Sequence, residues 1–460
     1  MSTLIKNGII ATASDVFKGD LYIESGIIKE IGLKLEKSRC HVIDAEGKYI
    51  IPGGVDVHTH LNLDVGIGVS NDDFYTGTVA AACGGTTTIV DHMGFGPKGC
   101  NLHHQVKVYH EYAKNNAVID YGFHGVIQHI NDDILKEMKD IIEIEGIPSF
   151  KIYLTYDFKL SDEEAIKTLL RLKKLGGLTT VHAENHYMIK YLKKKFIDNR
   201  KIQPIYHALS RPEESEAEAI SRIIHLAYVS DNAPLYIVHL STKLGLDYIK
   251  RAQETGCNVY AETCPQYLLL DEEKYNLPNN EGLKYIMSPP IRKKHNQKAL
   301  WKGIRDGNIQ VIATDHCPFS FYREKQMGRE DFTKCPNGIP GVETRIPLIF
   351  SEGVMKNRID INKFVEVTST APSKIFGLYP KKGTIAVGSD ADIVLIDTKK
   401  EVVLTKKILH ENVDYTCYEG MKLVGYPILT MVRGKIVVKN HDFVGEKGYG
   451  EFICRRKNIS

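Results

Sequence analysis

Several features that mark whole classes of protein are missing from this sequence. Lys and Arg number 60 against 57 Asp and Glu, so the formal net charge is only +3 and gives no support to a nucleic-acid or membrane-surface role. No apolar run reaches the roughly 20 residues that span a bilayer. The first residues, MSTLIKNGII, lack the basic stretch, apolar run and cleavage site of a secretion signal. We therefore predict no nucleic-acid partner and no membrane partner.

Paired cysteines are missing as well. The sequence has nine cysteines, an odd number, and none of them forms a C-x-x-C pair. Such scattered cysteines are typical of free thiols in a reducing compartment, so we expect a cytoplasmic protein without disulfides.

The two ends of the chain differ in pattern from its middle. LIKNGII and DLYIES near the start, and PILTMVRGKIVVKN near the end, are short β-runs with glycine turns. Between them, β-runs such as LTTVH and LYIVHL alternate with stretches such as EEAIKTLLRLKKLG, whose apolar residues recur at helical spacing. This alternation predicts an α/β fold, a (β/α)8 TIM-like barrel. A doubly wound open sheet is the alternative, but no G-x-G-x-x-G follows an early strand.

The same pattern predicts the domain organisation. We expect a catalytic barrel over residues 52–376 and a small β-sandwich domain built from residues 1–51 and 377–440. Residues 441–460 would form a C-terminal tail, a candidate oligomer contact, with the basic end Arg455 to Lys457 in solvent.

Histidines and an aspartate stand at the ends of several predicted barrel strands. His58 and His60 in GGVDVHTH are two apart, so both side chains leave the same face of a strand. LTTVH ends at His182, LYIVH at His239 and VIATD at Asp315. Because the carboxyl ends of barrel strands meet at one face, these five side chains should converge on a metal site. Other histidines lack this full context, and we expect structural roles for them: His92, His103, His104, His124, His129 and His207.

A lysine stands on another predicted strand, in SFKIYLTYDF. Four histidines and an aspartate are too many for one catalytic zinc that keeps an open position, and they suit two divalent ions. An ammonium group at Lys151 would be repelled by such ions. A neutral lysine amine reacts with carbon dioxide, and the carbamate can give one oxygen to each metal. We therefore predict two divalent metal ions, zinc with manganese or cobalt as alternatives, bridged by N6-carboxylysine at Lys151 and a hydroxide.

The motifs HTH, FKIYLTY, VHAEN, IVHLS and ATDHCPF resemble those of the cyclic amidohydrolases, and most of all the hydantoinase/dihydropyrimidinase family. Longer blocks, such as AAACGGTTTIVDHMGFGP, IYHALSRP and CPNGIPGVE, are similar to the D-phenylhydantoinase type within it. The resemblance extends over the whole chain and implies a homotetramer. It also implies how the ligands divide: His58, His60 and Asp315 on one metal, His182 and His239 on the other, and carboxylated Lys151 between them.

The resemblance implies a hydrolytic reaction on a small cyclic amide. The bridging hydroxide would attack a ring carbonyl, and Asp315 would carry a proton to the leaving nitrogen. The hydroxyl of Tyr156 would stabilise the developing oxyanion, and Ser288 and Asn337 would hold the cyclic –CO–NH– unit, largely through backbone groups. Because Tyr156 follows Lys151 by five residues, strict alternation would separate them, so the strand must end before Tyr156.

Apolar residues in the predicted loops favour a bulky or aromatic ring substituent, and they are candidates for the substituent pocket: Leu63, Val65, Ile67, Phe95, Tyr153 and Phe158. The predicted activity is hydrolysis of D-5-substituted hydantoins to N-carbamoyl-D-amino acids. Dihydropyrimidinase has the same ligands and is the alternative, followed by allantoinase and a non-catalytic tetrameric interaction protein of the same fold. Dihydroorotase-like enzymes place an arginine two residues after the H-x-H pair, where this chain has Asn62.

Overall fold

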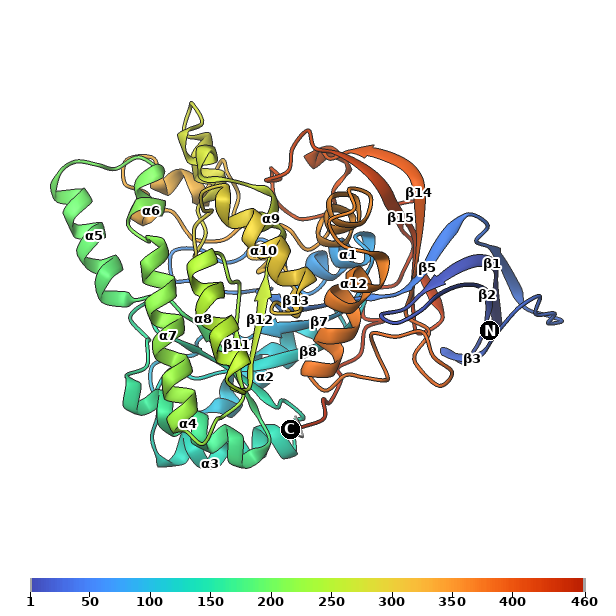
Figure 1. The fold of residues 1–460 in the computed structure, drawn as a ribbon, viewed down its shortest axis with the longest axis horizontal. Coiled ribbons are helices and arrows are strands. Elements are labelled where there is room, and N and C mark those ends of the chain that lie inside the picture. The colour runs from blue at the N-terminus through green and yellow to red at the C-terminus, as the bar shows by residue number, and fades with distance from the viewer. Residues whose placement is uncertain (1, 458–460) are drawn as a thin grey trace.

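Eight parallel strands form a barrel in the middle of the chain (Figure 1). The structure is a computed structural model and describes residues 2–457. Each barrel strand pairs in parallel with the next, and a parallel bridge from Thr59 to His316 joins the first strand to the segment after the last. The predicted (β/α)8 barrel is confirmed. Its strands are β6 (Gly54–Thr59), β7 (Thr86–His92), β8 (Asp120–Val126), β9 (Ser149–Tyr153), β10 (Leu178–His182), β11 (Leu235–Ile237), β12 (Val259–Thr263) and β13 (Val311–Ile312).

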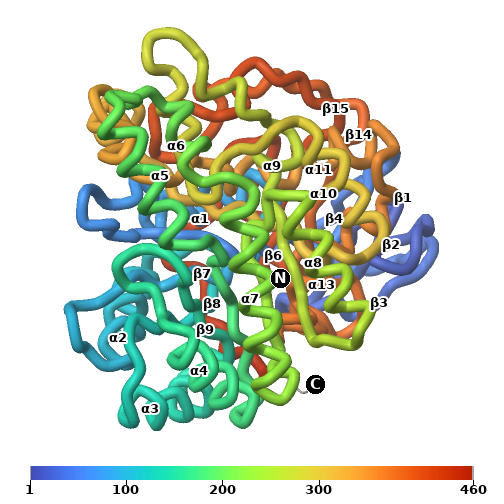
Figure 2. The backbone as a smooth tube through the Cα atoms, turned by 60° about the vertical axis from the view of Figure 1, so that its left-hand side comes forward, coloured from blue at the N-terminus to red at the C-terminus, as the bar shows by residue number. Residues whose placement is uncertain are grey.

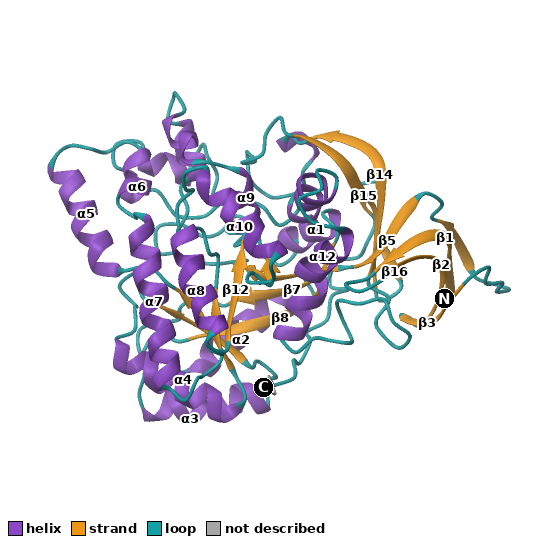
Figure 3. Cartoon of the chain, in the orientation of Figure 1, coloured by secondary structure: helices purple, strands orange, loops and turns teal. Residues whose placement is uncertain are grey.

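Helices cover the outside of the barrel, as the purple ribbons of Figure 3 show. The amphipathic pattern of the sequence explains their orientation: α4 buries Ala165, Leu169 and Leu172 and begins with a capping box of Ser161 and Glu164. The helices are α1 (Thr76–Cys83), α2 (Leu102–Ala113), α3 (Asp132–Glu143), α4 (Asp162–Leu175), α5 (His186–Asp198), α6 (Ile205–Leu209), α7 (Glu213–Val229), α8 (Lys243–Glu254), α9 (Pro265–Leu269), α10 (His295–Arg305), α11 (Arg345–Ile349), α12 (Ile361–Val365) and α13 (Ala371–Ile375).

Strand alternation decides which side chains enter the barrel. In β9, Phe150 and Ile152 join the apolar layer shared with the helices. Lys151 therefore points to the opposite face, into the barrel, and only 1% of its surface is exposed. The strand ends at Tyr153, so Tyr156 lies beyond it in a loop, as predicted.

Both ends of the chain build one second sheet, of mainly antiparallel strands, to the right of the barrel in Figures 1 and 3. β5 from the N-terminal part pairs antiparallel with β14 from the C-terminal part, and isoleucines from both parts, including Ile50 and Ile393, fill a separate core. A β-domain made from both chain ends is therefore confirmed, while boundaries at residues 52 and 376 stay a prediction. The strands are β1 (Ser2–Ala11), β2 (Val16–Glu24), β3 (Ile27–Gly32), β4 (His41–Asp44), β5 (Lys48–Pro52), β14 (Ile393–Val403), β15 (Lys422–Val432), β16 (Lys435–Lys439) and β17 (Asp442–Phe443).

The C-terminal segment returns to the barrel, at the end that also holds α3 and α4 (Figures 1 and 2). Arg455 is 5% exposed and donates to the hydroxyl of Ser149 at 2.7 Å and to the carbonyl oxygens of Phe123 and Phe376. Burial lowers its pKa to about 9. The expectation that the basic end lies in solvent is wrong for Arg455, because main-chain carbonyls at the closed end of the barrel accept its hydrogen bonds. Arg456 and Lys457 are exposed.

Within residues 2–457, none of the helices combines the length and the apolar composition that crossing a membrane requires.

A buried cation joins the β-domain to the barrel. The amine of Lys382 has no exposed surface and lies 2.5 Å from Asp120 of β8, 2.9 Å from Asp390 and 2.8 Å from Asp392. The three carboxylates raise the pKa of Lys382 against the opposing effect of burial, so the amine stays charged. Among the described residues, Lys382 is the one cation that approaches all three carboxylates, while Arg433 approaches Asp120 at 3.4 Å and Lys381 approaches Asp390 at 3.9 Å.

Replacing Lys382 with Met should lower the free energy of unfolding by about 3–5 kcal/mol, because it leaves buried carboxylates without their counter-charge. Denaturant unfolding followed by circular dichroism measures this change. Lys381→Met is the matched control: its amine is 3.9 Å from Asp390 and its side chain is 57% exposed, so its effect should stay within about 1 kcal/mol. Equal effects of the two substitutions would contradict the importance of the buried cation.

Candidate metal centre and active site

The metal-ligand residues predicted from the sequence converge at the carboxyl ends of the barrel strands. His58 lies near the end of β6 with His60 just beyond it, Lys151 lies within β9, and His182 is the last residue of β10. His239 follows β11 by two residues and Asp315 follows β13 by three. All four histidines are 7% exposed or less. One face of the barrel therefore holds the whole set in a nearly dry space.

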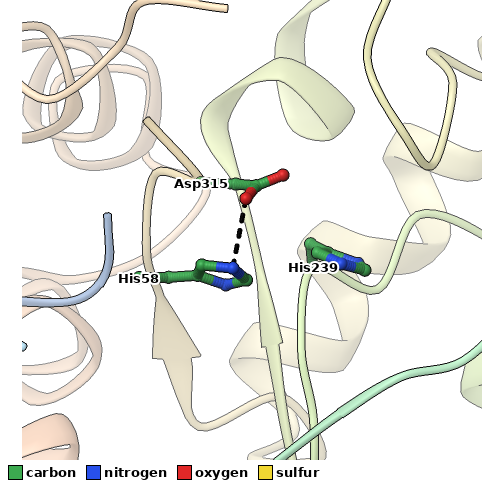
Figure 4. Close-up of side chains that lie close together, drawn as sticks. All are labelled: His58, His239 and Asp315. Atoms are coloured by element: carbon green, nitrogen blue, oxygen red, sulfur yellow. Dashed lines mark ion pairs between the residues drawn. The ribbon is translucent and has the colours of Figure 1, made fainter. Parts of the chain in front are cut away.

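Asp315 lies between the first two histidines. Its Oδ1 atom is 3.1 Å from Nε2 of His58 and 3.1 Å from Nε2 of His60. His239 lies across the same space from His58 (Figure 4). His58, His239 and Asp315 each have one ligand atom within 4.8 Å of the ligand atoms of the other two. Burial lowers the pKa of His60 to about 4, although Asp315 opposes this effect, so His60 is neutral near pH 7.

The orientation of the imidazoles leaves lone pairs facing this space. Nδ1 of His58 bonds to Glu262, a carboxylate that can only accept, so the neutral ring presents the lone pair of Nε2 to this space, although Glu262 and Asp315 raise the pKa of His58 against the effect of burial. In the same way, Nε2 of His182 donates to Glu184 at 2.8 Å, and its Nδ1 faces Nε2 of His239 at 2.9 Å. Buried lone pairs that face one another repel unless a cation or a proton lies between them. These donors therefore fit divalent metal ions.

Lys151 contributes an amine that burial makes less basic. Desolvation lowers its pKa to about 8, and the nearby charges of Asp315 and Glu262 oppose that shift. At pH 7, a pKa of about 8 leaves roughly a tenth of the amine neutral, against roughly one part in 3,000 for an ordinary lysine. The barrel interior thus supplies a nucleophilic amine beside the histidines.

Two glutamates that we did not predict orient the metal-ligand histidines. Glu262 of β12 is fully buried and accepts from His58, from the backbone NH of His239 at 3.0 Å and from the hydroxyl of Tyr236 at 2.8 Å. Glu184 accepts from His182 and from Arg211, and Arg211 helps to lower its pKa to about 2 against the effect of burial. Such partners fix the tautomer of a ligating imidazole. The sequence signal for Glu262 was its place near the end of the apolar run VYAET.

His92 lies closer to the centre than its predicted structural role implies. Its ring is 4.3 Å from that of His58 and 5.4 Å from that of His60, and it stacks on His124 at 4.1 Å. Burial holds the pKa of His92 well below its usual value, so the ring is neutral. His124 bonds to Ser149 and to the carbonyl oxygen of Val57 inside the barrel. His207 is also buried and bonds to the carbonyl oxygen of Met287.

Three of the predicted site residues have left-handed backbone conformations. The φ angles are 40° at His239, 56° at Asp315 and 70° at Tyr156. Such angles are uncommon for residues other than glycine, and they concentrate where surrounding structure holds a functional side chain in place. This strain turns the chain sharply where these strands give way to the loops of the barrel mouth.

The predicted substrate-binding residues lie around the same mouth. The ring of Tyr156 is 5.4 Å from that of His182, and the guanidinium of Arg211 lies 5.6 Å from it. Ser288 is 8% exposed, and its hydroxyl has no hydrogen-bond partner among the described residues. Asn337 is half-buried, and the NH of the next residue, Gly338, donates to the carbonyl oxygen of Ile286 at 3.0 Å. The loops that carry Ser288 and Asn337 are therefore adjacent.

The residues predicted for the substituent pocket divide into two groups. Phe95, Tyr153 and Phe158 are half-buried and contact one another, with ring centroids 3.7 to 5.4 Å apart. Leu63 lies against Gly94, next to Phe95. Val65 and Ile67 are instead 40% and 47% exposed, in a turn that the pairing of Asp64 with Val69 closes.

Known proteins share this architecture and sequence. The model of the amidohydrolase family matches residues 49–437. A curated D-phenylhydantoinase of Escherichia coli O1:K1 / APEC is 53% identical over 457 residues, which cover 99% of this chain and 98% of the relative. A crystal structure of D-hydantoinase superposes with a TM-score of 0.98 at 46% identity, and both chains are covered completely. The structure of dihydropyrimidinase from Brevibacillus agri NCHU1002 gives the same three values.

The family match extends over most of the chain, and the relatives are similar over their full length. The residues that these comparisons align include the strands that carry the converging histidines, the lysine and the aspartate. This chain therefore belongs to the amidohydrolase family, in its hydantoinase/dihydropyrimidinase branch.

Proposed function

We propose that this chain hydrolyses a ring amide bond of D-5-substituted hydantoins, preferably with an aromatic 5-substituent, and releases N-carbamoyl-D-amino acids. The observation that carries the proposal is the convergence of four histidines, Asp315 and the buried amine of Lys151 at one barrel mouth. The relatives named D-phenylhydantoinase and D-hydantoinase support the substrate class.

The six metal-binding residues would divide into two sets joined by Lys151: His58, His60 and Asp315 for one divalent ion, and His182 and His239 for the other. Zinc suits these nitrogen and oxygen donors, and manganese and cobalt are alternatives. Two bound ions would polarise a ring carbonyl and make hydroxide available near neutral pH.

Carboxylation of Lys151 completes this set. The neutral amine adds to the carbon of carbon dioxide, one N–C bond forms, and one proton is released. The product is an anion with two oxygens, so the nitrogen can no longer form an ammonium ion beside the metal ions. The lowered pKa of Lys151 supports this step, because only the neutral amine reacts.

Asp315 and Tyr156 would handle the proton and the developing negative charge. Water adds to the ring carbonyl carbon, the C–N bond breaks, and Asp315 passes a proton from the water to the leaving nitrogen. Nearby histidines hold the pKa of Asp315 well below its usual value despite burial, so the group is ionised and carries no proton of its own near neutral pH. Burial raises the pKa of Tyr156, so its hydroxyl stays protonated and can donate to the carbonyl oxygen.

Lys325 would position the loops that hold the cyclic –CO–NH– unit. Its amine is fully buried and donates to the carbonyl oxygen of Ile286 at 2.7 Å and to that of Pro336 at 2.8 Å. These atoms lie two residues before Ser288 and one residue before Asn337. One buried amine thus links the two stretches that would face the substrate amide.

The aromatic group of Phe95, Tyr153 and Phe158 supports a preference for aromatic substituents, because stacked and edge-to-face rings contribute about 0.5–1.5 kcal/mol per pair. Dihydropyrimidinase is the second candidate function, because a solved structure with that name is as similar as the D-hydantoinase. Allantoinase and a non-catalytic tetrameric interaction protein are alternatives of lower rank. The homotetramer stays a prediction, and light scattering tests it.

Replacing Lys151 with Ala should lower the metal content below two ions per chain and reduce kcat/KM by roughly a thousandfold or more, since metal ions supply several kcal/mol of transition-state stabilisation. Metal analysis and hydantoin turnover measure these losses, and acetate or propionate should restore part of the activity. Lys167→Ala on the exposed face of α4 is the control. Full activity of the Lys151 variant would contradict the proposal, and no metal in wild-type protein from metal-replete cells would support the non-catalytic alternative.

Side-by-side turnover should rank D-5-phenylhydantoin above L-5-phenylhydantoin, unsubstituted hydantoin, dihydrouracil and allantoin. The physical reason is contact between the phenyl ring and the aromatic group at the mouth, worth about tenfold in kcat/KM at 1.4 kcal/mol. Faster turnover of dihydrouracil than of D-5-phenylhydantoin would favour the dihydropyrimidinase alternative.

Replacing Lys325 with Met should raise KM for the hydantoin by about tenfold or more, because two buried hydrogen bonds that hold the substrate loops are lost. The bound metal should remain at the wild-type level, which separates a positioning role from general unfolding. Lys334→Met, at an exposed position nearby, serves as the control. An unchanged KM would show that the loops keep their separation without this amine.

A further inference from the structure

A second cluster of metal-ligand side chains lies where the barrel meets the β-domain. Cys83 is the last residue of α1, Glu343 precedes α11, and His410 lies in the connection from β14 to β15. One ligand atom from each of the three falls within 4.8 Å of the others. The cluster shares no residue with the centre at the barrel mouth.

The carboxylate of Glu343 is fully buried and has only histidine partners. Its Oε1 atom is 2.8 Å from Nδ1 of His410 and 3.8 Å from Nε2 of His441, and its Oε2 atom accepts from the backbone NH of His410 at 2.5 Å. Among the ion pairs of the described residues, Glu343 has none with lysine or arginine. A buried carboxylate is costly without a full counter-charge, so this site attracts a cation.

A second buried carboxylate increases this demand. Glu411 is 1% exposed, and its Oε1 atom accepts from the backbone NH of Glu343 at 3.4 Å, whereas its Oε2 atom has no hydrogen-bond partner among the described residues. Among the ion pairs of the described residues, the one partner of Glu411 is His316, whose Nδ1 atom lies 3.8 Å from Oε1. The two acidic groups therefore share a poorly compensated region.

Tyr426 of β15 provides an independent sign of an unfilled ligand position. Its side chain is 1% exposed, and its hydroxyl has no hydrogen-bond partner among the described residues. Its ring lies 5.4 Å from that of His441, whose Nε2 atom is 3.8 Å from Oε1 of Glu343, so Tyr426 borders the cluster. A buried hydroxyl without a partner is unfavourable unless a bound group or water satisfies it.

We propose that Cys83, Glu343 and His410 form an additional binding site for zinc or a similar borderline-soft divalent cation. Thiolate, imidazole and carboxylate together suit zinc, whereas magnesium and calcium take oxygen ligands. On binding, the thiol of Cys83 loses its proton to solvent and the sulfur bonds to the metal. Water completes the coordination of the ion.

Such a site would join parts of the chain that are far apart in sequence. One ion would be shared by helix α1, the segment before α11 and the connection between β14 and β15. The ion would lie next to β15, β16 and β17, against which α1 packs. A cation bound only by the folded protein stabilises it, so zinc should raise the melting temperature through this site.

Cobalt substitution tests the proposal directly, because the centre at the barrel mouth includes no cysteine ligand. Full-length protein loaded with Co²⁺ should show thiolate-to-cobalt charge-transfer absorption in the near ultraviolet, and it should retain one more metal ion per chain than Cys83→Ala after dialysis. The absorption should vanish in Cys83→Ala and weaken in His410→Ala, while Cys100→Ala, at a half-buried cysteine elsewhere, should keep it.

Hydantoin turnover by Cys83→Ala should equal that of the wild type, and the stabilisation by added zinc should be smaller than in Cys100→Ala. His410→Ala keeps the test decisive if the loss of the buried Cys83 side chain impairs folding, because the His410 side chain is 29% exposed. Absence of charge-transfer absorption in the wild type, or equal metal content in wild type and Cys83→Ala, would overturn the proposal. These outcomes do not depend on turnover, so they leave the proposed hydrolytic function untouched.

Discussion

Removal of water from the barrel mouth is the condition on which the other properties of the centre depend. Desolvation keeps His60 and His92 neutral and lowers the pKa of Lys151 to about 8, so imidazole lone pairs and a larger fraction of neutral amine are available at this mouth. The same dry surroundings make every unpaired polar atom costly, so Glu184 and Glu262 are needed to hold the ligand imidazoles in one tautomer. Proposed metal binding and proposed carboxylation thus have one physical origin.

Buried charge also connects the two parts of the molecule. Lys382 holds carboxylates from the barrel and from the segment that leads into β14, and Arg455 binds carbonyl oxygens at the closed end of the barrel. At the cluster of Cys83, Glu343 and His410, by contrast, acidic groups lack such a cation. The junction therefore includes satisfied ion pairs at one place and, at another, a group of ligands suited to a metal ion.

Local patterns predicted most of the fold because they have direct local causes. Alternating apolar runs and helical spacing identified the barrel. The end of β9 before Tyr156 followed from alternation together with the site role that the family resemblance implies for Tyr156. Histidines and an aspartate at strand ends identified the candidate metal ligands, since all strand ends of a barrel meet at one face. Arg455 was misjudged, because its partners at Phe123, Ser149 and Phe376 lie far away in the chain.

The order of amino acids determines the barrel, the candidate metal ligands that it carries and the loop position of Tyr156. These features follow from the sequence because strand periodicity and side-chain chemistry act over a few residues. The supporting groups do not follow from it. Glu262 meets His58 from 204 positions away, and Lys325 joins the carbonyl oxygens of Ile286 and Pro336 across two loops. Burial, tautomers and pKa values at this centre depend on which distant side chains exclude water around it, and closure of the barrel alone brings those side chains together.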